Sequence, residues 1–344
     1  MAAHRRPKQP SRARVTVLTG AAATAVALSA QVSAHAAPAQ PGKDEVKAQV
    51  DRLMEEQERA AEKYNGAKER ADQLRKQADQ LQDQLARGQQ QLTELAAGLA
   101  AVAGDEYRQG GIDPSVRLML STDPDEYLTR ATSFDRAAGT QADTLKALKD
   151  QQRRLDQQKR EAADVLAELD GQTQLLNGAK NDVQAKLRES QQLLGRLSAA
   201  EQRAVLDGDG AASRSAERVD PSTLPPASGS AAVAVRVALE QQGKPYHWSA
   251  TGPDQFDCSG LMVYAYAQAH VSLPRTSQEQ ATVGTNVGDD WHNAQPGDLV
   301  IYYGDRHHVG MYIGNGMVVH APHSGDVVKV MKVDAMPISV IRRV

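Results

Sequence analysis

The chain of 344 residues contains a single cysteine, Cys258, and this scarcity limits what the cysteine can do. One cysteine cannot close a disulfide within its own chain, so in an oxidising compartment it forms an intermolecular link or remains a reactive thiol. An excess of basic residues is also lacking, because the chain has 40 Lys and Arg and 43 Asp and Glu. With no basic stripe to neutralise phosphates, the sequence argues against nucleic acid as the main partner.

Acidic residues are absent from the first 36 positions, which start with five basic residues. An alanine-rich apolar stretch from Val15 to about Ala30 follows, and Ala34-His35-Ala36 offers small residues for cleavage. This pattern predicts a signal peptide over residues 1–36, with an uncleaved membrane anchor as the alternative. We therefore expect a secreted protein with no stable membrane insertion after cleavage. Its formal charge falls from −3 to −8, because cleavage removes five basic residues and no acidic ones.

Residues 43–206 are rich in Ala, Gln, Glu, Leu, Arg and Lys and carry two heptad patterns. The first pattern holds without a slip over residues 46–102, and the second covers residues 145–197. Such spacing predicts two long coiled-coil helices. Gly110-Gly111 and two prolines interrupt the pattern between them, which predicts an antiparallel hairpin with short helices at its tip.

Several seam positions of this hairpin hold residues that are too small or too polar for a tight two-stranded coil. They are alanines together with Gln57, Gln152, Lys159, Thr173 and Lys180. Either the helices pack closely through alanine, or the hairpin is marginal and binds something else. Two roles stay open. The hairpin is a solvated spacer, or it is a regulatory arm that makes an autoinhibitory contact with the C-terminal part or recruits a protein partner.

Residues 207–230 are rich in Gly, Ser and Pro and predict a flexible linker. The remaining residues, 231–344, suffice for one compact domain. We expect a helix at about 231–242 and a second helix that opens at Cys258. Strands are predicted at 298–303, 308–313, 317–321, 326–332 and 338–343, with a tight turn at Gly314-Asn315-Gly316. Helices followed by an antiparallel sheet predict a layered α+β domain.

Cys258 lies in the segment Phe256-Asp257-Cys258-Ser259-Gly260-Leu261, which predicts a strand-to-helix turn. The free N–H groups and positive dipole of a helix N-terminus stabilise a thiolate. We therefore interpret Cys258 as a nucleophile, and a buried inert thiol is the alternative. A thiolate nucleophile needs a base within hydrogen-bond reach and a third group that orients the base. Pairing across the hairpin turn brings His308 and His320 together, which makes His308 the base and His320 its orienting partner.

All seven histidines beyond residue 36 lie in the last hundred residues, and not all of them need a catalytic role. His307 points to the opposite face from His308 once the strand has begun, so we expect one of the two to be a surface residue. His323 reads as a loop residue. With His308 and His320 these form a histidine-rich patch that could hold zinc, but a zinc site leaves Cys258 without a role. We expect no metal and no cofactor.

Five short blocks in the last third of the chain together resemble the NlpC-type cysteine peptidases of bacterial cell walls, a branch of the papain-like group. The blocks are Phe256-Asp-Cys-Ser-Gly260, Leu273-Pro-Arg-Thr-Ser277 with Gln280, Pro296-Gly-Asp-Leu299, His308-Val-Gly-Met-Tyr-Ile-Gly314 and Val319-His-Ala-Pro322. The resemblance implies a papain-like α+β domain over residues 231–344. By pattern alone, the preceding segment resembles the helical hairpins of secreted actinobacterial enzymes.

The same resemblance implies a peptidoglycan endopeptidase, extracellular or associated with the cell wall, that cleaves stem peptides. The bond usually cut in the family joins the side-chain carboxyl of D-glutamate to the following diamino acid. By position, Cys258 matches the nucleophile, His308 the base and His320 the third polar residue. Substrate-binding positions are matched by Tyr246, Asp257, Ser259 and Arg275.

One loop departs from the family pattern. The family often has Tyr-x-Trp-Gly-Gly where this chain has Tyr246-His-Trp-Ser-Ala250, which puts specificity in doubt more than activity. Two other functions stay open. One is a non-catalytic protein that binds the wall or activates another hydrolase, and the other is a different acyl-transfer enzyme on the same fold, such as an amidase or a ligase.

Overall fold

The computed structural model describes residues 43–108, 116, 119–120, 124–206, 219 and 223–344. The predicted signal peptide, the predicted tip of the hairpin up to residue 123 and most of the predicted linker lie outside these described residues. Within the described ranges, no helix combines the length and the apolar character needed to cross a membrane.

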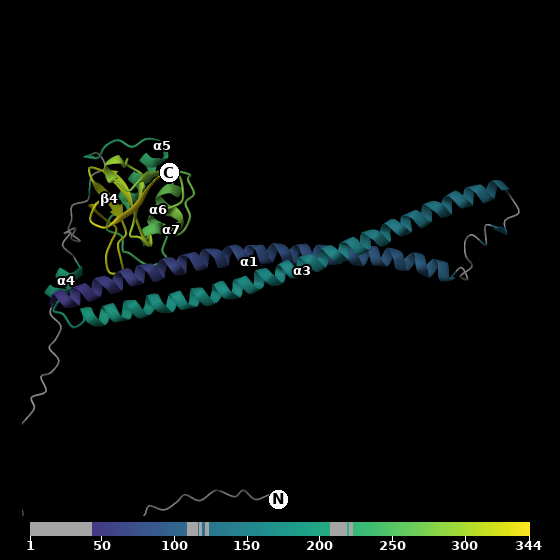
Figure 1. Cartoon of the computed structure of the whole chain (residues 1–344), viewed down its shortest axis with the longest axis horizontal. Coiled ribbons are helices and arrows are strands. Elements are labelled where there is room, and N and C mark those ends of the chain that lie inside the picture. The colour runs from purple at the N-terminus through teal and green to yellow at the C-terminus, as the bar shows by residue number, and fades with distance from the viewer. Residues whose placement is uncertain (1–42, 109–115, 117–118, 121–123, 207–218, 220–222) are drawn as a thin grey trace, which may run out of the picture. The chain divides into compact units, whose positions relative to one another are not determined.

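Two long helices, α1 (Lys43–Arg108) and α3 (Pro124–Leu194), pack side by side as the predicted hairpin (Figure 1). A short helix, α4 (Ala199–Leu206), follows. Helix α3 starts well before the predicted register, because proline is tolerated in the first helical turn, where its missing N–H would be unpaired anyway. The segment that begins at Pro124 therefore belongs to α3 and is not a separate short helix at the tip.

The seam of α3 differs from the predicted seam at every second position. The structure turns positions 151, 158, 165, 172 and 179 toward α1, where the heptad pattern predicted 152, 159, 166, 173 and 180. Val165 and Ala179 are buried, whereas the side chain of Leu166 is 55% exposed. The prediction was wrong here because it followed leucine. The observed register leaves Lys159 and Lys180 in solvent and so avoids burying two charges.

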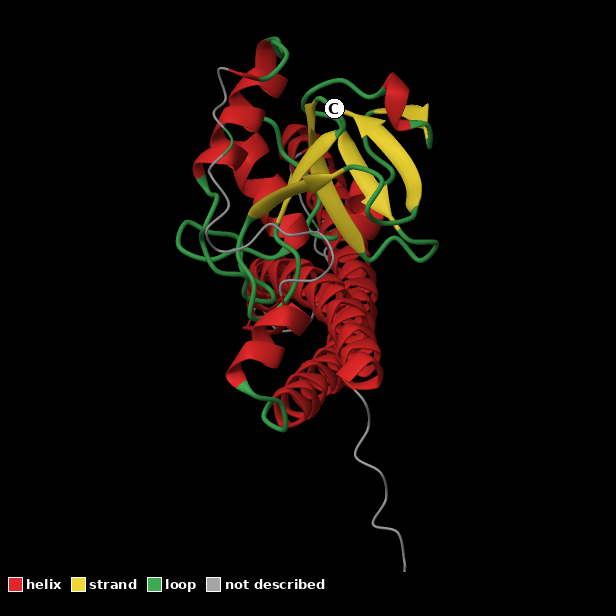
Figure 2. Cartoon of the chain, turned by 90° about the vertical axis from the view of Figure 1, so that its left-hand side faces the viewer, coloured by secondary structure: helices red, strands yellow, loops and turns green. Residues whose placement is uncertain are grey.

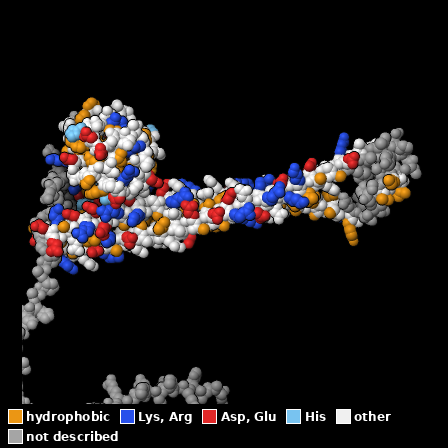
Figure 3. Space-filling view, in the orientation of Figure 1, with side chains coloured by type: hydrophobic (Ala, Val, Ile, Leu, Met, Phe, Trp, Pro, Cys, Tyr) orange, Lys and Arg blue, Asp and Glu red, His pale blue; other side chains and the backbone are white. Residues whose placement is uncertain are grey.

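The hairpin seam is well filled only in parts, as the polar seam residues predicted. Val50 and Leu53 pack with Leu193 near one end of the hairpin. Further along, the amide of Gln151 donates a hydrogen bond to the carbonyl oxygen of Gly88 inside the seam. Figure 3 shows basic and acidic side chains interspersed along the visible face of the hairpin.

The C-terminal part folds as the expected α+β layers, with helices packed on a six-stranded antiparallel sheet (Figure 2). Its helices are α5 (Gly229–Glu240), α6 (Cys258–Ala267), α7 (Ser277–Gln280) and the 3-10 turn η2 (Trp291–Asn293). The strands are β1 (Thr285–Gly288), β2 (Leu299–Tyr302), β3 (His308–Gly314), β4 (Met317–His320), β5 (Lys329–Lys332) and β6 (Ile338–Arg343), in the order β1-β6-β2-β3-β4-β5.

The five predicted strands are confirmed within a few residues, and the sheet gains one strand that the sequence pattern did not indicate. Strand β1 is four residues long, is largely exposed and pairs with β6 at the edge of the sheet. Such a short segment has no alternation of apolar and polar residues that could reveal it. Helix α7 escaped notice for the same reason, since it has a single turn.

Both faces of the sheet are covered. Along β2, Leu299 and Ile301 pack into the core beneath α5 and α6, while Val300 and Tyr302 pack into a second cluster on the other face. This two-sided burial explains why the strand reads as a continuous apolar run. Helix α6 packs against β3, which brings its first residue close to the start of that strand.

The described end of the predicted linker lies against the domain. Val219 and Leu224 pack on the core, and helix α5 begins at Gly229. Pro225 lies so close to Gly314 that a Cβ there would approach within 2.5 Å of Pro225 Cδ. Gly314 also has φ +97, a conformation that favours glycine.

Candidate active site

Cys258 is the first residue of α6, as the sequence predicted, and its thiol is only 2% exposed. Asp257 caps the helix by accepting a hydrogen bond of 2.7 Å from the Gly260 N–H. Gly260 allows the preceding loop to approach, because a Cβ there would lie 2.1 Å from the Ala250 carbonyl oxygen. The tight turn fixes the thiol at the N-terminal end of α6, where the helix dipole favours an anion.

His308 and His320 meet as the hairpin prediction required. His308 begins β3, His320 ends β4, and their Nε2 and Nδ1 atoms are 2.9 Å apart. Gly310 lies beside His320 in the neighbouring strand, since a Cβ at Gly310 would come within 3.4 Å of His320 Cβ. The rings meet edge to face at 5.2 Å between centroids.

Burial sets the protonation state of His320. Desolvation lowers the pKa of His320 well below its usual value, and the neighbouring His308 and Lys329 add to the effect. A neutral His320 accepts a hydrogen bond at Nδ1 when its proton sits on Nε2. The Nε2 proton of His308 then points at His320, and its Nδ1 is free to accept a proton.

The thiol is surrounded by negative charge. Burial raises the pKa of Cys258 well above its usual value, and the carboxylates of Glu62, Asp257 and Glu58 raise it further. A hydrogen bond from the Ser259 N–H works in the opposite direction and lowers the pKa of Cys258. The Cys258 Sγ atom lies 4.0 Å from Glu62 Oε1 and 4.0 Å from the His307 carbonyl oxygen. In this arrangement the thiol form is strongly favoured over the thiolate.

Three predicted substrate-binding residues form one buried network. Arg275 binds the Asp257 carboxylate with both terminal nitrogens, and its Nη1 donates a bond of 2.8 Å to Ser259 Oγ. Gln280 supports the network by donating 3.1 Å to the Ser259 carbonyl oxygen. The guanidinium is thus directed at Asp257, so it holds the network in place.

Glu62 of α1 enters this network, and sequence reasoning missed it. Its buried carboxylate accepts hydrogen bonds from Ser259 Oγ at 2.9 Å, from the Ser277 N–H at 2.7 Å and from Ser277 Oγ at 3.0 Å. Asn65, one turn further along the helix, donates 3.2 Å bonds to both Glu62 and Asp257. A glutamate in a polar coiled-coil helix carries no signal that would separate it from solvated neighbours.

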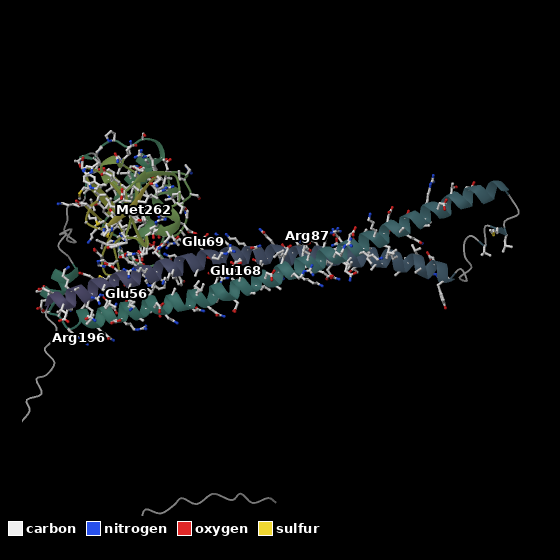
Figure 4. All side chains as sticks on the ribbon, viewed as in Figure 1. Glu56, Glu69, Arg87, Glu168, Arg196 and Met262 are labelled. Carbon is white, nitrogen blue, oxygen red and sulfur yellow. The ribbon has the colours of Figure 1, made fainter. Side chains whose placement is uncertain are left out.

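Glu58, also of α1 and also missed, faces the histidine pair. Its Oε2 atom lies 3.2 Å from His308 Nδ1, outside hydrogen-bond geometry. A cavity of about 280 Å³ opens beside His308 and His320 and has Glu58 and Met54 of α1 in its wall. Figure 4 labels Glu56 and Glu69 on the same helix, on either side of this stretch.

The remaining predicted residues lie near the site in different roles. Tyr246 is buried, and burial together with nearby Cys258 raises its pKa, so its phenol stays protonated. The expectation that His307 or His308 is a surface residue was wrong. Both are buried, and His307 stacks on Tyr303 at 4.3 Å between ring centroids. His323 lies in a bend beyond β4, as expected for a loop residue.

The loop that departs from the family pattern has a backbone that favours glycine. Ser249 has φ +63, and Trp248 beside it packs edge to face on Tyr64 of α1 at 5.0 Å between centroids.

Among the described residues, no group of three or more His, Cys, Asp or Glu side chains is arranged to hold a metal ion.

Comparisons with known proteins agree with this geometry. A probable endopeptidase of Corynebacterium glutamicum is 45% identical over 112 residues, which cover 33% of this chain and 53% of the relative. A probable endopeptidase of Mycobacterium tuberculosis is 41% identical over 109 residues, which cover 32% of this chain and 28% of the relative. The chain thus spans about half or less of the length of these relatives.

The chain is also similar in sequence to a protein of known structure. The peptidoglycan hydrolase RipB of Mycobacterium tuberculosis is 33% identical, with 36% of this chain and 69% of that chain covered and a TM-score of 0.31. Residues 243–339 match the family model described as the NlpC/P60 family. This matched range contains Cys258, His308 and His320. The C-terminal part of the chain, residues 243–339, therefore matches the NlpC/P60 family.

Proposed function

We propose that the chain is a cysteine endopeptidase that hydrolyses peptidoglycan stem peptides outside the cell. Three observations support the proposal: Cys258 begins α6, its Sγ lies 4.0 Å from the carbonyl oxygen of His307, the residue before His308, and His308 meets His320 at 2.9 Å. All of these residues lie in the segment that matches the NlpC/P60 family. The names of the relatives, probable endopeptidases and a peptidoglycan hydrolase, support the same reading. Residues 1–36 would direct export and then be removed.

In this proposal, His308 Nδ1 takes the proton of the Cys258 thiol, and His320 holds the other ring nitrogen. The thiolate attacks the scissile carbonyl and forms a tetrahedral oxyanion. A backbone N–H at the start of α6 and the protonated Tyr246 phenol are the donors available to that oxyanion. Collapse expels the amine, which takes a proton from His308. Water activated by His308 then hydrolyses the thioester.

The subsite occupied by Glu62 supports the D-glutamyl to diamino-acid bond as the target. Ser259 Oγ, Ser277 N–H and Ser277 Oγ together hold a carboxylate within 4.0 Å of the thiol. D-glutamate linked through its side chain keeps a free α-carboxylate near the scissile carbonyl, so this acyl donor fits such a subsite. In that role Arg275 supplies positive charge and fixes Asp257 and Ser259.

Mass spectrometry of the soluble products tests the proposal. The full chain is incubated with purified peptidoglycan, and Cys258→Ala is run alongside. Disaccharide-dipeptides with matching diamino-acid fragments, made only by the chain that keeps Cys258, are the expected products. Glycan freed of peptide would indicate an amidase instead, and products that also appear with Cys258→Ala would exclude Cys258 as the nucleophile.

A further inference from the structure

We propose that helix α1 is a built-in inhibitor of the active site, in which Glu62 takes the place of a substrate carboxylate and Glu58 blocks the base. The inference rests on the proposed function of Cys258 and His308, and it names the regulation of that site. It predicts that the enzyme works only after residues 57–66 of α1 have separated from the C-terminal domain.

Glu62 occupies the site as a ligand would. Three donors of the C-terminal domain, Ser259 Oγ, Ser277 N–H and Ser277 Oγ, converge on its two carboxylate oxygens at 2.7 to 3.0 Å. The same carboxylate lies 4.0 Å from Cys258 Sγ. An acyl group cannot reach the thiol while this space is filled, so the contact excludes substrate by occupancy.

Glu58 acts one helical turn away on the second catalytic group. Its carboxylate lies 3.2 Å from His308 Nδ1, the nitrogen that faces away from His320. A carboxylate at this position lies against the nitrogen that would receive the proton of the thiol. Spacing of four residues puts Glu58 and Glu62 on one face of α1, so a single rigid helix blocks both groups.

Contacts outside the site hold this part of α1 in place. Gln57 donates a hydrogen bond to Ser324 Oγ, and Arg59 pairs with Asp305 at 3.1 Å. Tyr64 packs on Trp248, on the other side of the carboxylates along the helix. Gly66 faces the methyl group of Thr276, and a Cβ there would lie 3.6 Å from Thr276 Cγ2. These contacts span about two and a half turns of one helix.

The interface between α1 and the C-terminal domain has features that allow the two to separate. It is mostly polar, and burial beside Asp257 raises the pKa of Glu62 to about 7. The free-energy cost of removing this carboxylate from water offsets part of the stabilisation that its hydrogen bonds contribute. Polar contacts of this kind can exchange for water when the helix leaves. On the same stretch of α1, Ala60 and Ala61 pack with Val183 of α3 as well as with Trp248 of the domain.

The single cysteine of the chain provides a probe that needs no substrate. We would measure the rate at which iodoacetamide alkylates Cys258 in the full chain, by intact mass. The variant Glu58→Ala/Glu62→Ala removes both carboxylates and keeps helix propensity high. The control is Glu69→Ala, an exposed position on the same helix.

A second variant separates occlusion from electrostatics. Removing two carboxylates also lowers the pKa of Cys258, which alone would speed alkylation. Arg59→Ala/Tyr64→Ala weakens the anchoring contacts and leaves Glu58 and Glu62 in place. Separation of α1 therefore predicts faster alkylation in this variant as well, while a purely electrostatic effect predicts no change.

We expect both double variants to be alkylated at least about tenfold faster than the wild-type chain and Glu69→Ala, with a parallel rise in peptidoglycan cleavage. Rates within about twofold of wild type in both double variants, with the fold intact by circular dichroism, would overturn the inhibitory role. An increase confined to Glu58→Ala/Glu62→Ala would overturn it too. Faster alkylation without any Cys258-dependent cleavage would leave occlusion standing and count against the proposed endopeptidase.

Discussion

Glu62 of α1 and Ser277 of α7 lie 215 residues apart in the chain, yet the backbone N–H and the hydroxyl of Ser277 both donate to one carboxylate oxygen of Glu62. The pair connects the coiled-coil hairpin to the part of the site where substrate is expected. The two roles left open for the hairpin, a spacer or a regulatory arm, can therefore be distinguished by testing what the Glu62 carboxylate does. The contact favours the regulatory arm.

Replacement of the nucleophile should abolish turnover and leave the fold unchanged. Cys258→Ala removes the only thiol at the start of α6 and creates little space, so we expect cleavage to fall at least about a thousandfold. Circular dichroism and thermal unfolding should match the wild-type chain within error. Near-native cleavage by purified Cys258→Ala would rule out the mechanism.

His320 should act through His308 and not on the substrate. His320→Ala removes the acceptor 2.9 Å from His308 Nε2, and we expect kcat to fall about 10- to 100-fold with little change in KM. His320→Gln keeps an acceptor oxygen and should recover part of the loss. The variants are best compared in the Glu58→Ala/Glu62→Ala background, where the site is open. A purely structural role would show equal losses for Ala and Gln.

Docking of α1 should weaken as pH rises. The pKa of Glu62 is about 7 when docked, against a usual value of 4.5, because of burial and the Asp257 charge, while Arg275 opposes the shift. A raised pKa in the docked state means that the stabilisation is complete below about pH 4.5 and is lost as pH passes 7. The loss is at most about 3 kcal/mol. The other titratable groups that face the same space are the Cys258 thiol and the Glu58 carboxylate.

Tryptophan fluorescence can follow this dependence, because Trp248 packs on Tyr64 of α1. With Trp291→Phe, Trp248 is the sole tryptophan and Cys258→Ala removes the thiol. We expect its emission to shift toward the exposed state between pH 5 and 8, and Glu62→Gln to flatten this change. An identical titration in Glu62→Gln would show that Glu62 does not control docking.

The unusual loop offers a stability test that is independent of function. Ser249 adopts φ +63, where an L-residue pays a steric cost and glycine does not. Ser249→Gly should therefore stabilise the domain by about 0.5–1 kcal/mol after the entropic cost of glycine. Chemical unfolding measures the difference, with Ser249→Ala as the control that keeps a Cβ. Equal stability of the Gly and Ala variants would contradict the account of this loop.

The layered α+β domain, the hairpin, the place of Cys258 at the start of a helix and the contact between His308 and His320 were predictable, because each depends on local patterns. A helix-opening cysteine and a short turn between two histidine-bearing strands bring chemistry together without long-range information. The seam register at Val165 and the roles of Glu58 and Glu62 were not predictable. They depend on which face of a polar helix meets which partner, and a glutamate that is buried looks like one in solvent.

The most direct test of the account is the release of soluble peptide from peptidoglycan by three full-length chains under the same conditions. They are the wild type, Glu58→Ala/Glu62→Ala, and the latter with Cys258→Ala added. The account predicts slow release by the wild type, at least about tenfold faster release by the open variant, and none once Cys258 is gone. Equal release by the first two chains, or release that persists without Cys258, would contradict it.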